Sequence, residues 1–134
     1  MCTNKYGVWL SRIRMGLSAL NHHRYQYNFI NSPLCTTCNE SSETTYHFFF
    51  LCTTYQIARQ TFFNNLHNQL GINIANSPNL LNTILEGHHI HPRHYAKLLS
   101  IVTDYLSDTG RFNWSDCITS SLLWFSRHAP PPKY

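Results

Sequence analysis

The clearest pattern along the chain is a series of apolar stripes at helical spacing, each followed by a glycine. In residues 5–15, apolar side chains recur at intervals of three and four residues, which places them on one face of a helix, at Tyr6, Trp9, Leu10 and Ile13. The same spacing recurs in residues 54–70, 80–85 and 95–106. A glycine just past the last periodic residue typically ends a helix, and the four stretches are followed in order by Gly16, Gly71, Gly87 and Gly110. The pattern therefore predicts four helices, and Pro92 suits the first turn of the last one.

Two further stretches carry weaker helical signals. Residues 18–29 can form a helix with Ser18 as its N-cap, although basic and aromatic side chains blur the apolar period there. Ser115 and Asp116 can cap a short last helix that runs through Trp124. Strand-type alternation is not sustained over four or more residues anywhere in the sequence. We therefore expect an all-α fold.

The length of the chain fits one domain. A chain of 134 residues can bury a single core, and we expect one small helical domain over residues 5–112. Residues 113–134 follow as a C-terminal extension. It ends in a proline-rich segment, residues 128–134, that cannot be helical and is expected to be disordered or polyproline-like.

The spacing of cysteine and histidine gives the strongest chemical signal. Cys35, Cys38, His47 and Cys52 form the pattern C-x2-C-x8-H-x4-C. Two cysteines separated by two residues can reach one ion from a tight loop, and structural zinc sites take four tetrahedral thiolate and imidazole ligands. The spacing predicts one structural Zn²⁺ bound by these four side chains, on a loop and helix that span residues 33–53.

The same spacing sets a condition on the backbone. Five residues of ideal α-helix rotate by about 500°, which leaves His47 and Cys52 roughly 140° apart around the helix axis. Both can bind one ion only if the helix loosens or ends between them. Three thiolates and one imidazole also leave no open position for a reacting water, so we expect a structural ion and no catalysis.

Other interpretations of these residue types stay open. The three motif cysteines can be small core side chains, or Cys35 and Cys38 can be a redox pair, although no βαβ pattern surrounds them. Cys2 and Cys117 have no partner at ligand spacing and are expected to be free thiols. Four clustered histidines resemble a second metal site but fit a solvated loop and helix start better: His88, His89, His91 and His94.

The net charge is mildly basic. Lys and Arg outnumber Asp and Glu by ten to six, for a formal net charge of +4, which permits contact with a polyanion without requiring it. The best candidates for phosphate contacts are Arg12, Arg14 and Arg24, together with Lys5 and Arg59. An ordinary solvated surface explains these residues equally well. Most aromatic side chains lie at helical spacing and are expected in the core rather than stacked on bases.

The sequence also favours an intracellular protein. It starts Met1-Cys2-Thr3 without the apolar segment of a secretory signal, and an odd count of five cysteines argues against a disulfide framework. No apolar run approaches the roughly 20 residues that cross a bilayer. We expect a nuclear or cytoplasmic protein with no membrane association.

The block from Arg12 to Tyr55 resembles the zinc-binding segment near the C-terminus of reverse transcriptases of non-LTR (LINE-like) retrotransposons. Residues 12–24 are similar to the family's Arg-x-Gly element followed by a Leu-Asn-x-His-Arg sequence. Residues 33–38 match the first ligand pair, Glu43-Thr44 matches an acidic-threonine pair before the histidine, and residues 47–52 match the second ligand pair. Beyond the motif the likeness weakens.

Departures from the family pattern bear on function. Many members have proline directly after the last cysteine, where this chain has Thr53. Residues 95–112 are similar to a helix that often closes such proteins, whereas residues 113–134 fall outside the resemblance. Nothing resembles a polymerase palm with paired aspartates, because the carboxylates stand apart, at Glu40, Glu43, Glu86, Asp104, Asp108 and Asp116. The resemblance thus implies a non-catalytic fragment without the polymerase.

The function implied by the resemblance is a zinc-binding accessory domain that helps the parent enzyme bind RNA or DNA, with no small-molecule substrate. Its nucleic-acid contacts would fall ahead of the zinc loop, at Arg12, Arg14, His22 and Arg24. A second hypothesis is a structural or protein-interaction module whose zinc only links helices. A third, a thiol redox enzyme, needs a low-pKa Cys35 or Cys38.

Overall fold

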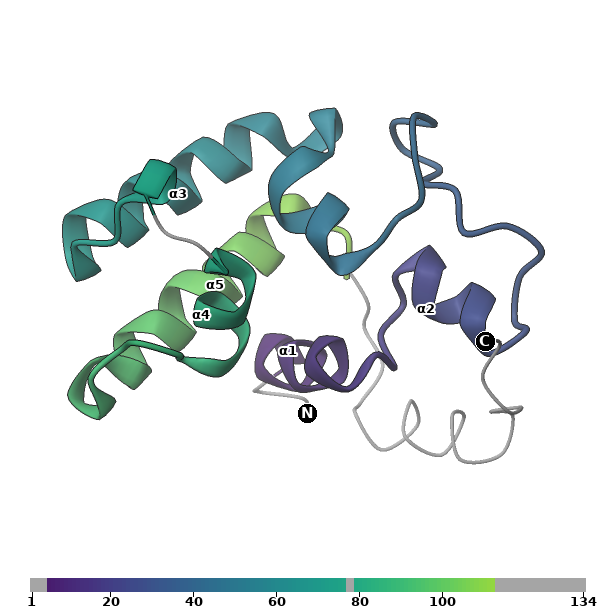
Figure 1. The fold of residues 1–134 in the computed structure, drawn as a ribbon. Coiled ribbons are helices and arrows are strands. Elements are labelled where there is room, and N and C mark those ends of the chain that lie inside the picture. The colour runs from purple at the N-terminus through teal and green to yellow at the C-terminus, as the bar shows by residue number, and fades with distance from the viewer. Residues whose placement is uncertain (1–4, 77–78, 113–134) are drawn as a thin grey trace.

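The computed structural model describes residues 5–76 and 79–112, and most of these residues are helical (Figure 1). In chain order the helices are α1 (Lys5–Met15), α2 (Asn21–Gln26), η1 (His47–Leu51), η2 (Thr53–Tyr55), α3 (Gln56–Leu70), η3 (Ile74–Asn76), α4 (Leu80–Glu86), η4 (Pro92–His94) and α5 (Tyr95–Thr109). Within the described ranges the one β-type contact is an isolated bridge between Leu34 and Ser42. The predicted all-α fold is confirmed.

The strongly periodic stretches form helices where the sequence predicts them. α1, α3, α4 and α5 are followed directly by their predicted glycines, which all have φ between 65° and 74°. This left-handed conformation satisfies the last carbonyls of a helix and carries no Cβ penalty in glycine. The predicted helix after Ser115 and the proline-rich segment lie outside the described residues. None of the described helices is long and apolar enough to cross a membrane.

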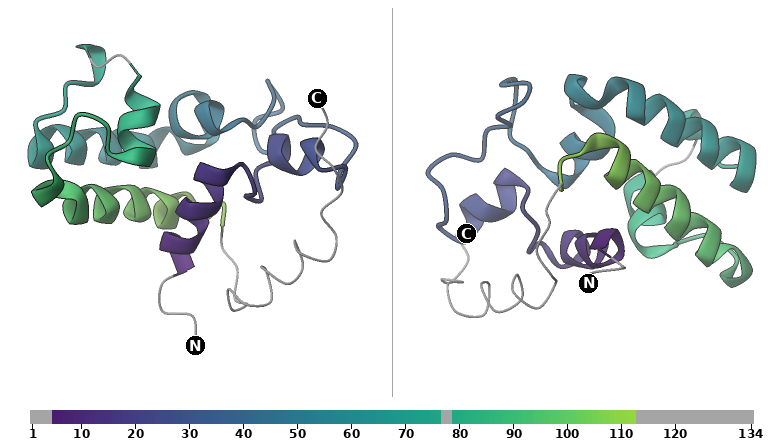
Figure 2. Two further views of the ribbon diagram at one scale, coloured as in Figure 1. Left: turned by 60° about the horizontal axis from the view of Figure 1, so that its bottom comes forward. Right: turned by 180° about the vertical axis from the view of Figure 1, so that it is seen from behind.

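The helices form one packed group with the cysteine loop at its end. α3 and α5 lie side by side and run in opposite directions (Figure 1), and α1 packs against both α5 and α4. The two views in Figure 2 show α2 and the loop that follows it beside this group rather than within it. The loop therefore needs its own attachments to the core.

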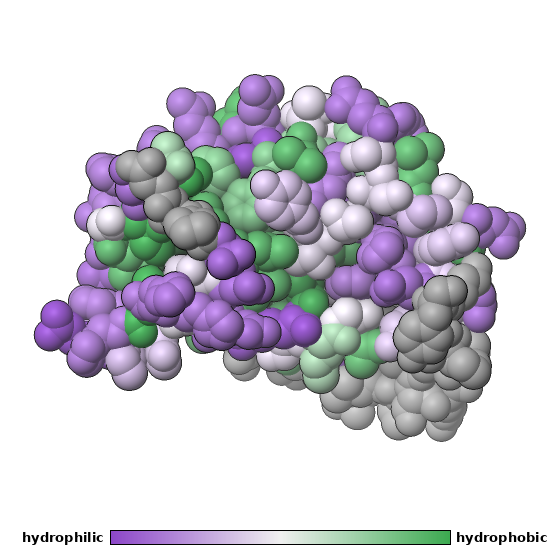
Figure 3. Space-filling view, in the orientation of Figure 1, coloured by the Kyte–Doolittle hydropathy of each residue, from purple (hydrophilic) through white to green (hydrophobic). Residues whose placement is uncertain are grey.

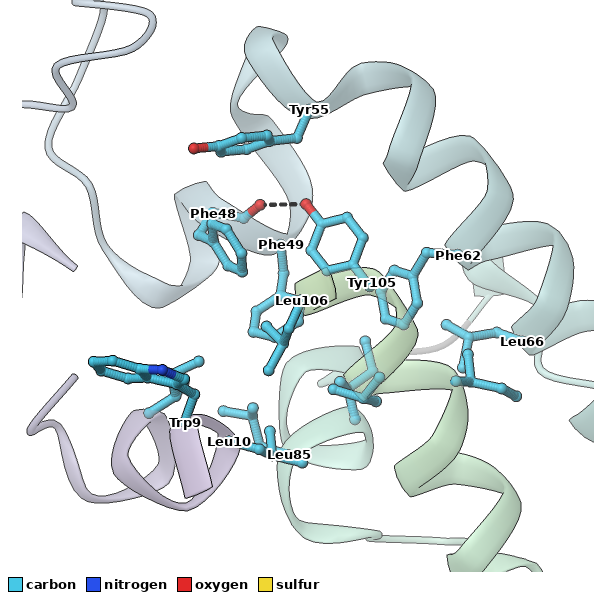
Figure 4. Packing of buried hydrophobic residues seen from close by; sticks show 14 of the residues in the cluster. Trp9, Leu10, Phe48, Phe49, Tyr55, Phe62, Leu66, Leu85, Tyr105 and Leu106 are labelled. Carbon is cyan, nitrogen blue, oxygen red and sulfur yellow. Dashed lines mark hydrogen bonds between the residues drawn. The ribbon is translucent and has the colours of Figure 1, made fainter. Parts of the chain in front are cut away.

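An aromatic cluster supplies one such attachment (Figure 4). Phe48 of η1 has ring-centroid separations of 5.4 Å from Tyr105, 5.1 Å from Phe49 and 5.5 Å from Phe112. Tyr105 in turn stacks on Phe62 of α3 at 4.7 Å. Burial of this much aromatic surface is the main source of stability in a small domain. Because His47 and Cys52 flank the buried phenylalanines, the second ligand pair is fixed to the core.

The predicted helix over residues 18–29 is shorter in the structure, and Ser18 is not its N-cap. α2 begins at Asn21, and the Oγ atom of Ser18 instead lies 2.7 Å from Nδ1 of His23. The N–H group of Asn21 donates to the carboxylate of Glu43 at 2.8 Å. A carboxylate from a later segment therefore satisfies the first turn of α2. No local pattern could reveal a cap supplied from so far along the chain.

Candidate metal centre

The four predicted ligands meet at one point in the fold. The ligand atoms of Cys35, Cys38, His47 and Cys52 all lie within 4.8 Å of one another. The Sγ atoms of Cys35 and Cys52 are 3.8 Å apart, and Sγ of Cys38 lies 3.4 Å from Nε2 of His47. All but Cys38 are buried, and the three cysteines are free thiols. This arrangement can bind one metal ion.

The first ligand pair lies on a tight turn. The N–H group of Asn39 donates to the carbonyl of Cys35 at 2.9 Å, and Asn39 has a φ of 58°, a left-handed conformation that asparagine tolerates. Backbone N–H groups of Thr37 and Cys38 donate to the sulfur of Cys35, and that of Glu40 donates to the sulfur of Cys38. Such amide donors favour the charged thiolate over the neutral thiol.

The three thiols have different pKa values for identifiable reasons. Burial alone raises the pKa of Cys35, but hydrogen bonds from the Thr37 hydroxyl and from the N–H groups of Cys38 and Thr37 outweigh it and lower this pKa. The pKa of Cys52 is lowered too, because the Thr37 hydroxyl and a backbone N–H oppose its burial. The N–H of Glu40 lowers the pKa of Cys38, but burial and the other two thiols raise it on balance. Two sulfurs are thus predisposed to the thiolate form that binds metals.

The helix loosens between the second pair of ligands, as the spacing requires. η1 is a π-helix, in which an N–H group bonds to the carbonyl five residues earlier, and the N–H of Cys52 donates to the carbonyl of His47 at 2.8 Å. The helix then ends, because Cys52 has an extended backbone with φ −64° and ψ 122°. The wider turn lets both ligands reach the first pair. The predicted condition on the backbone is confirmed.

Side chains from α3 and α5 satisfy the carbonyls of η1. The Arg59 guanidinium donates to the carbonyls of Phe49, at 3.0 Å, and Cys52, and the Tyr105 hydroxyl donates to that of Phe48 at 2.7 Å (Figure 4). Carbonyls at a helix C-terminus carry partial negative charge, so a buried guanidinium is favourable there. Arg59 is buried, and its assignment to phosphate contacts was wrong.

The orientation of the histidine ligand depends on two hydroxyl groups. Ser41 Oγ lies 2.9 Å from Nδ1 of His47, which leaves Nε2 directed at Cys38. Thr44 Oγ1 accepts a hydrogen bond from the N–H of His47 at 3.0 Å and caps the short helix that carries the ligand. Hydrogen-bond partners of this kind fix the tautomer and ring orientation of a ligating histidine. Ser41 was missed from the sequence, where the only signal was the hydroxyl-rich composition of the loop.

Glu43 links the cysteine loop to α2 and to Arg111, which lies two residues beyond the end of α5. Its carboxylate, 1% exposed, accepts hydrogen bonds at 2.8 Å from the N–H of Asn21 and from both Nε and Nη2 of Arg111. Its own N–H donates to the carbonyl of Pro33 at 2.8 Å, just ahead of the first cysteine. The carboxylate thus points to α2 and Arg111 and not to the start of the helix that carries His47.

Arg12, the first of the predicted nucleic-acid residues, is not presented to solvent. Its side chain is 2% exposed and lies over the ring of Trp9, with the guanidinium carbon 5.1 Å from the ring centroid. Burial also lowers the pKa of Arg12. This burial disfavours the predicted phosphate contact of Arg12, which stays a prediction.

The other predicted nucleic-acid residues are more accessible. Arg14 is exposed, although its guanidinium donates to the carbonyl of Leu85. His22 and Arg24 are half-buried on α2, and Arg24 lines a groove of about 590 Å³ beside the cysteine loop. The side chain of Lys5 lies outside the described part of the structure. Three of the four residues thus keep some access to solvent.

The histidines between α4 and α5 do not form a metal site. His88, His89 and His91 are exposed, and Nε2 of His88 lies 3.2 Å from Oε2 of Glu86. Apart from the centre described above, residues 5–76 and 79–112 hold no group of three or more metal-ligating side chains. The solvated loop and helix start expected from the sequence fits this region.

The geometry of the four ligands identifies the candidate metal centre by itself. The resemblance to a reverse transcriptase segment rests on the motif residues alone and stays a prediction. Comparison of the chain with protein-family models, curated proteins and solved structures gives no match.

Proposed function

We propose that the chain is a helical domain in which one structural Zn²⁺ fixes the cysteine loop against η1. The ligand separations carry the proposal. A tetrahedral zinc ion, about 2.3 Å from sulfur and 2.0 Å from nitrogen, needs ligand atoms about 3.8 Å apart for two sulfurs and 3.5 Å for sulfur and nitrogen. Cys35 and Cys52 meet the first value at 3.8 Å, and Cys38 and His47 are close to the second at 3.4 Å.

The donor set supports zinc over other ions and a structural role over a catalytic one. Three sulfurs and one imidazole suit zinc, whereas calcium and magnesium take oxygen ligands. Four protein ligands leave no open position on the ion. A redox role is disfavoured, because Cys35 and Cys52, the two thiols whose pKa values are lowered, are fully buried, whereas a reactive cysteine must be accessible.

We further propose that this domain is a non-catalytic accessory part of a retrotransposon reverse transcriptase and helps it bind RNA or DNA inside the cell. The support is the motif resemblance together with the groove beside the cysteine loop, where Arg24 lies among polar side chains of Asn21, Asn31, Ser32 and Thr36. Phosphate recognition needs such cations and donors near one another.

A zinc-stabilised module without nucleic-acid contact is the second candidate. The observation that favours it is the internal use of basic residues. Arg12 and Arg59 are buried, and the Arg111 guanidinium is paired with Glu43. The guanidiniums of Arg12 and Arg59 are thus buried, and the charge of Arg111, whose side chain is 19% exposed, is balanced by Glu43, so fewer basic side chains face solvent than the composition suggests.

Metal content tests the zinc proposal. The full chain should contain one zinc per molecule by elemental analysis, and serine at Cys35, Cys38 or Cys52 should remove the zinc and unfold the loop, since structural zinc binding contributes about 10–16 kcal/mol in small peptides. Cys2→Ser and Cys117→Ser are the matched controls and should keep one zinc. A well-folded, zinc-free chain whose ligand variants fold equally well contradicts the proposal.

Salt-dependent binding tests the nucleic-acid role. Binding of the zinc-loaded chain to single-stranded RNA and to nicked DNA should weaken as salt rises. Arg24→Gln should reduce the slope of log affinity against log salt concentration by about one. Arg93→Gln, an exposed arginine far from the cysteine loop in the turn before α5, is the control and should leave the slope unchanged. Absent or salt-insensitive binding leaves the zinc-stabilised module as the function.

A further inference from the structure

An apolar groove of about 670 Å³ opens where η1, α3 and α4 approach one another. Its apolar wall comes from Phe50, Leu51, Phe63, Ile74, Leu80 and Leu81, and Asn79 and Asn82 contribute to a polar part that is nearly as large. None of the described residues that line it carries a charge. Figure 3 shows apolar surface gathered on this face between α3 and α4.

The rim of this groove is built from large side chains left uncovered. Tyr46 is 53% exposed and Leu51 is 55% exposed. Tyr46 packs on Phe50 at a centroid separation of 4.9 Å, and Phe50 stacks on Phe63 at 6.1 Å, so the wall is held in place by its own contacts. A contiguous apolar hollow of this kind marks an interaction site, whereas single exposed apolar residues need no explanation.

We propose that this groove binds the apolar stripe of the chain's own C-terminal extension, residues 114–125. Apolar side chains recur there at helical spacing, at Trp114, Ile118, Leu122 and Phe125, and Asp116 is the one charged residue of the stretch. A short amphipathic helix is marginal in water unless its apolar face is buried against a partner. The apolar wall of this uncharged groove is the matching surface.

The extension leaves the described domain close enough to reach the groove. Phe112, the last described residue, is buried against Phe48 at a centroid separation of 5.5 Å. The ring centroids of Phe48 and Phe49 are 5.1 Å apart and those of Phe49 and Phe50 are 6.3 Å apart, and Phe50 forms part of the groove wall. The rings of Phe112 and Phe50 are therefore no more than about 17 Å apart. Two extended residues from Phe112 to Trp114, followed by eight helical residues to Leu122, can span about 19 Å.

Other occupants fit the groove less well. A nucleic acid would find aromatic rings but no cation among the described lining residues to pair with its phosphates. A second copy of the chain, or a separate apolar partner, would compete with a segment already tethered at an effective concentration in the millimolar range. The tethered segment therefore has the advantage.

The direct test is proximity in the full zinc-loaded chain. With methyl-labelled leucine and isoleucine, we expect nuclear Overhauser contacts between methyl groups of Ile118 or Leu122 and those of Leu51 or Leu81. A sample mixed from differently labelled copies should show no such contacts. Absence of the contacts overturns the proposal, and contacts found only between differently labelled copies assign the groove to a second molecule instead.

A thermal-melting cycle tests the same contact without spectral assignment. Leu51→Asp, at a groove residue that is 55% exposed, and Leu122→Asp should each lower Tm by about 5 °C, and together by no more than the larger single effect, because both remove one interface. Ile57→Asp, at an exposed apolar residue outside the groove, is the control and should add independently to Leu122→Asp. Full additivity of the groove and extension variants overturns the proposal. The proposal is also overturned if added single-stranded RNA shifts the methyl resonances of the groove residues and of no other residues. The zinc measurement is separate, so either result can fail without the other.

Discussion

Replacing Glu43 with alanine tests how the cysteine loop is fixed to the rest of the domain. The carboxylate is 1% exposed and accepts hydrogen bonds from the N–H of Asn21 and from two nitrogens of Arg111. Breaking a buried ion pair by removing one partner typically costs about 3–5 kcal/mol, and loss of a helix cap costs about 1 kcal/mol. Arg111 keeps a bond to the carbonyl of Ala19, and its side chain is 19% exposed, so water relieves part of the penalty. We expect a loss of about 3 kcal/mol.

Urea denaturation at a fixed free-zinc concentration measures this loss. Glu43→Gln is the matched variant, because it keeps an oxygen for the N–H of Asn21 but removes the charge that pairs with Arg111. It should cost less than Glu43→Ala. Arg111→Met in the Glu43→Gln background should recover part of the loss, because the unpaired cation is then gone. Glu43→Ala and Glu43→Gln should each still bind one zinc, since the backbone N–H at position 43, which donates to the carbonyl of Pro33, is unchanged.

The outcome that refutes this reasoning is a small or additive effect. A loss below about 1 kcal/mol for Glu43→Ala is the size seen for an exposed ion pair and would place the pair at the surface. Full additivity of the changes at Glu43 and Arg111 would show that the two side chains act separately. Loss of zinc together with stability would show that the carboxylate acts on the ligands and not on the attachment of the loop.

Three further predictions follow from individual contacts. Ser41→Ala should weaken zinc affinity about 10–100-fold in a chelator competition, because Nδ1 of His47 loses its partner, and unchanged affinity contradicts the role of the hydroxyl. Tyr105→Phe should cost about 1–3 kcal/mol in unfolding free energy, because it leaves the buried carbonyl of Phe48 without its donor, and no loss means that water replaces it. Burial lowers the pKa of His23 to about 4 in the folded chain, whereas a histidine in the unfolded chain has a pKa of about 6.5. Between about pH 6.5 and about pH 4 the unfolded chain therefore binds more protons, and the stability of the fold decreases as the pH drops. His23→Gln should remove up to about 3 kcal/mol of this pH dependence. Zinc loss in acid affects the original chain and the variant alike, so plots of stability against pH that run parallel for the two would contradict the role of His23.

The parts of the fold that the sequence predicts are those encoded within a short window. α1, α3, α4 and α5 each combine an apolar period with a glycine that adopts positive φ, and both signals lie within one helix length. The metal ligands are local in the same sense, because 18 residues contain all four. Their spacing even predicts the irregular turn after His47, since a regular α-helix cannot bring Cys52 to the same ion.

The polar contacts between distant segments could not be predicted, because a charged side chain gives no local sign of whether it faces water or a buried backbone group. Arg111 and Glu43 are separated by 68 positions, and the bonds from Arg59 to η1 depend on how α3 packs. The contacts of Arg59 have an identifiable structural cause. The loosened turn that brings His47 and Cys52 together buries carbonyls that must find donors, and a guanidinium supplies several at once. Arg59, a candidate for phosphate contacts by sequence, is therefore buried against η1. The formal charge of +4 overstates the charge that a polyanion meets, and any nucleic-acid contact depends on the few cations, such as Arg24, that the domain leaves at its surface.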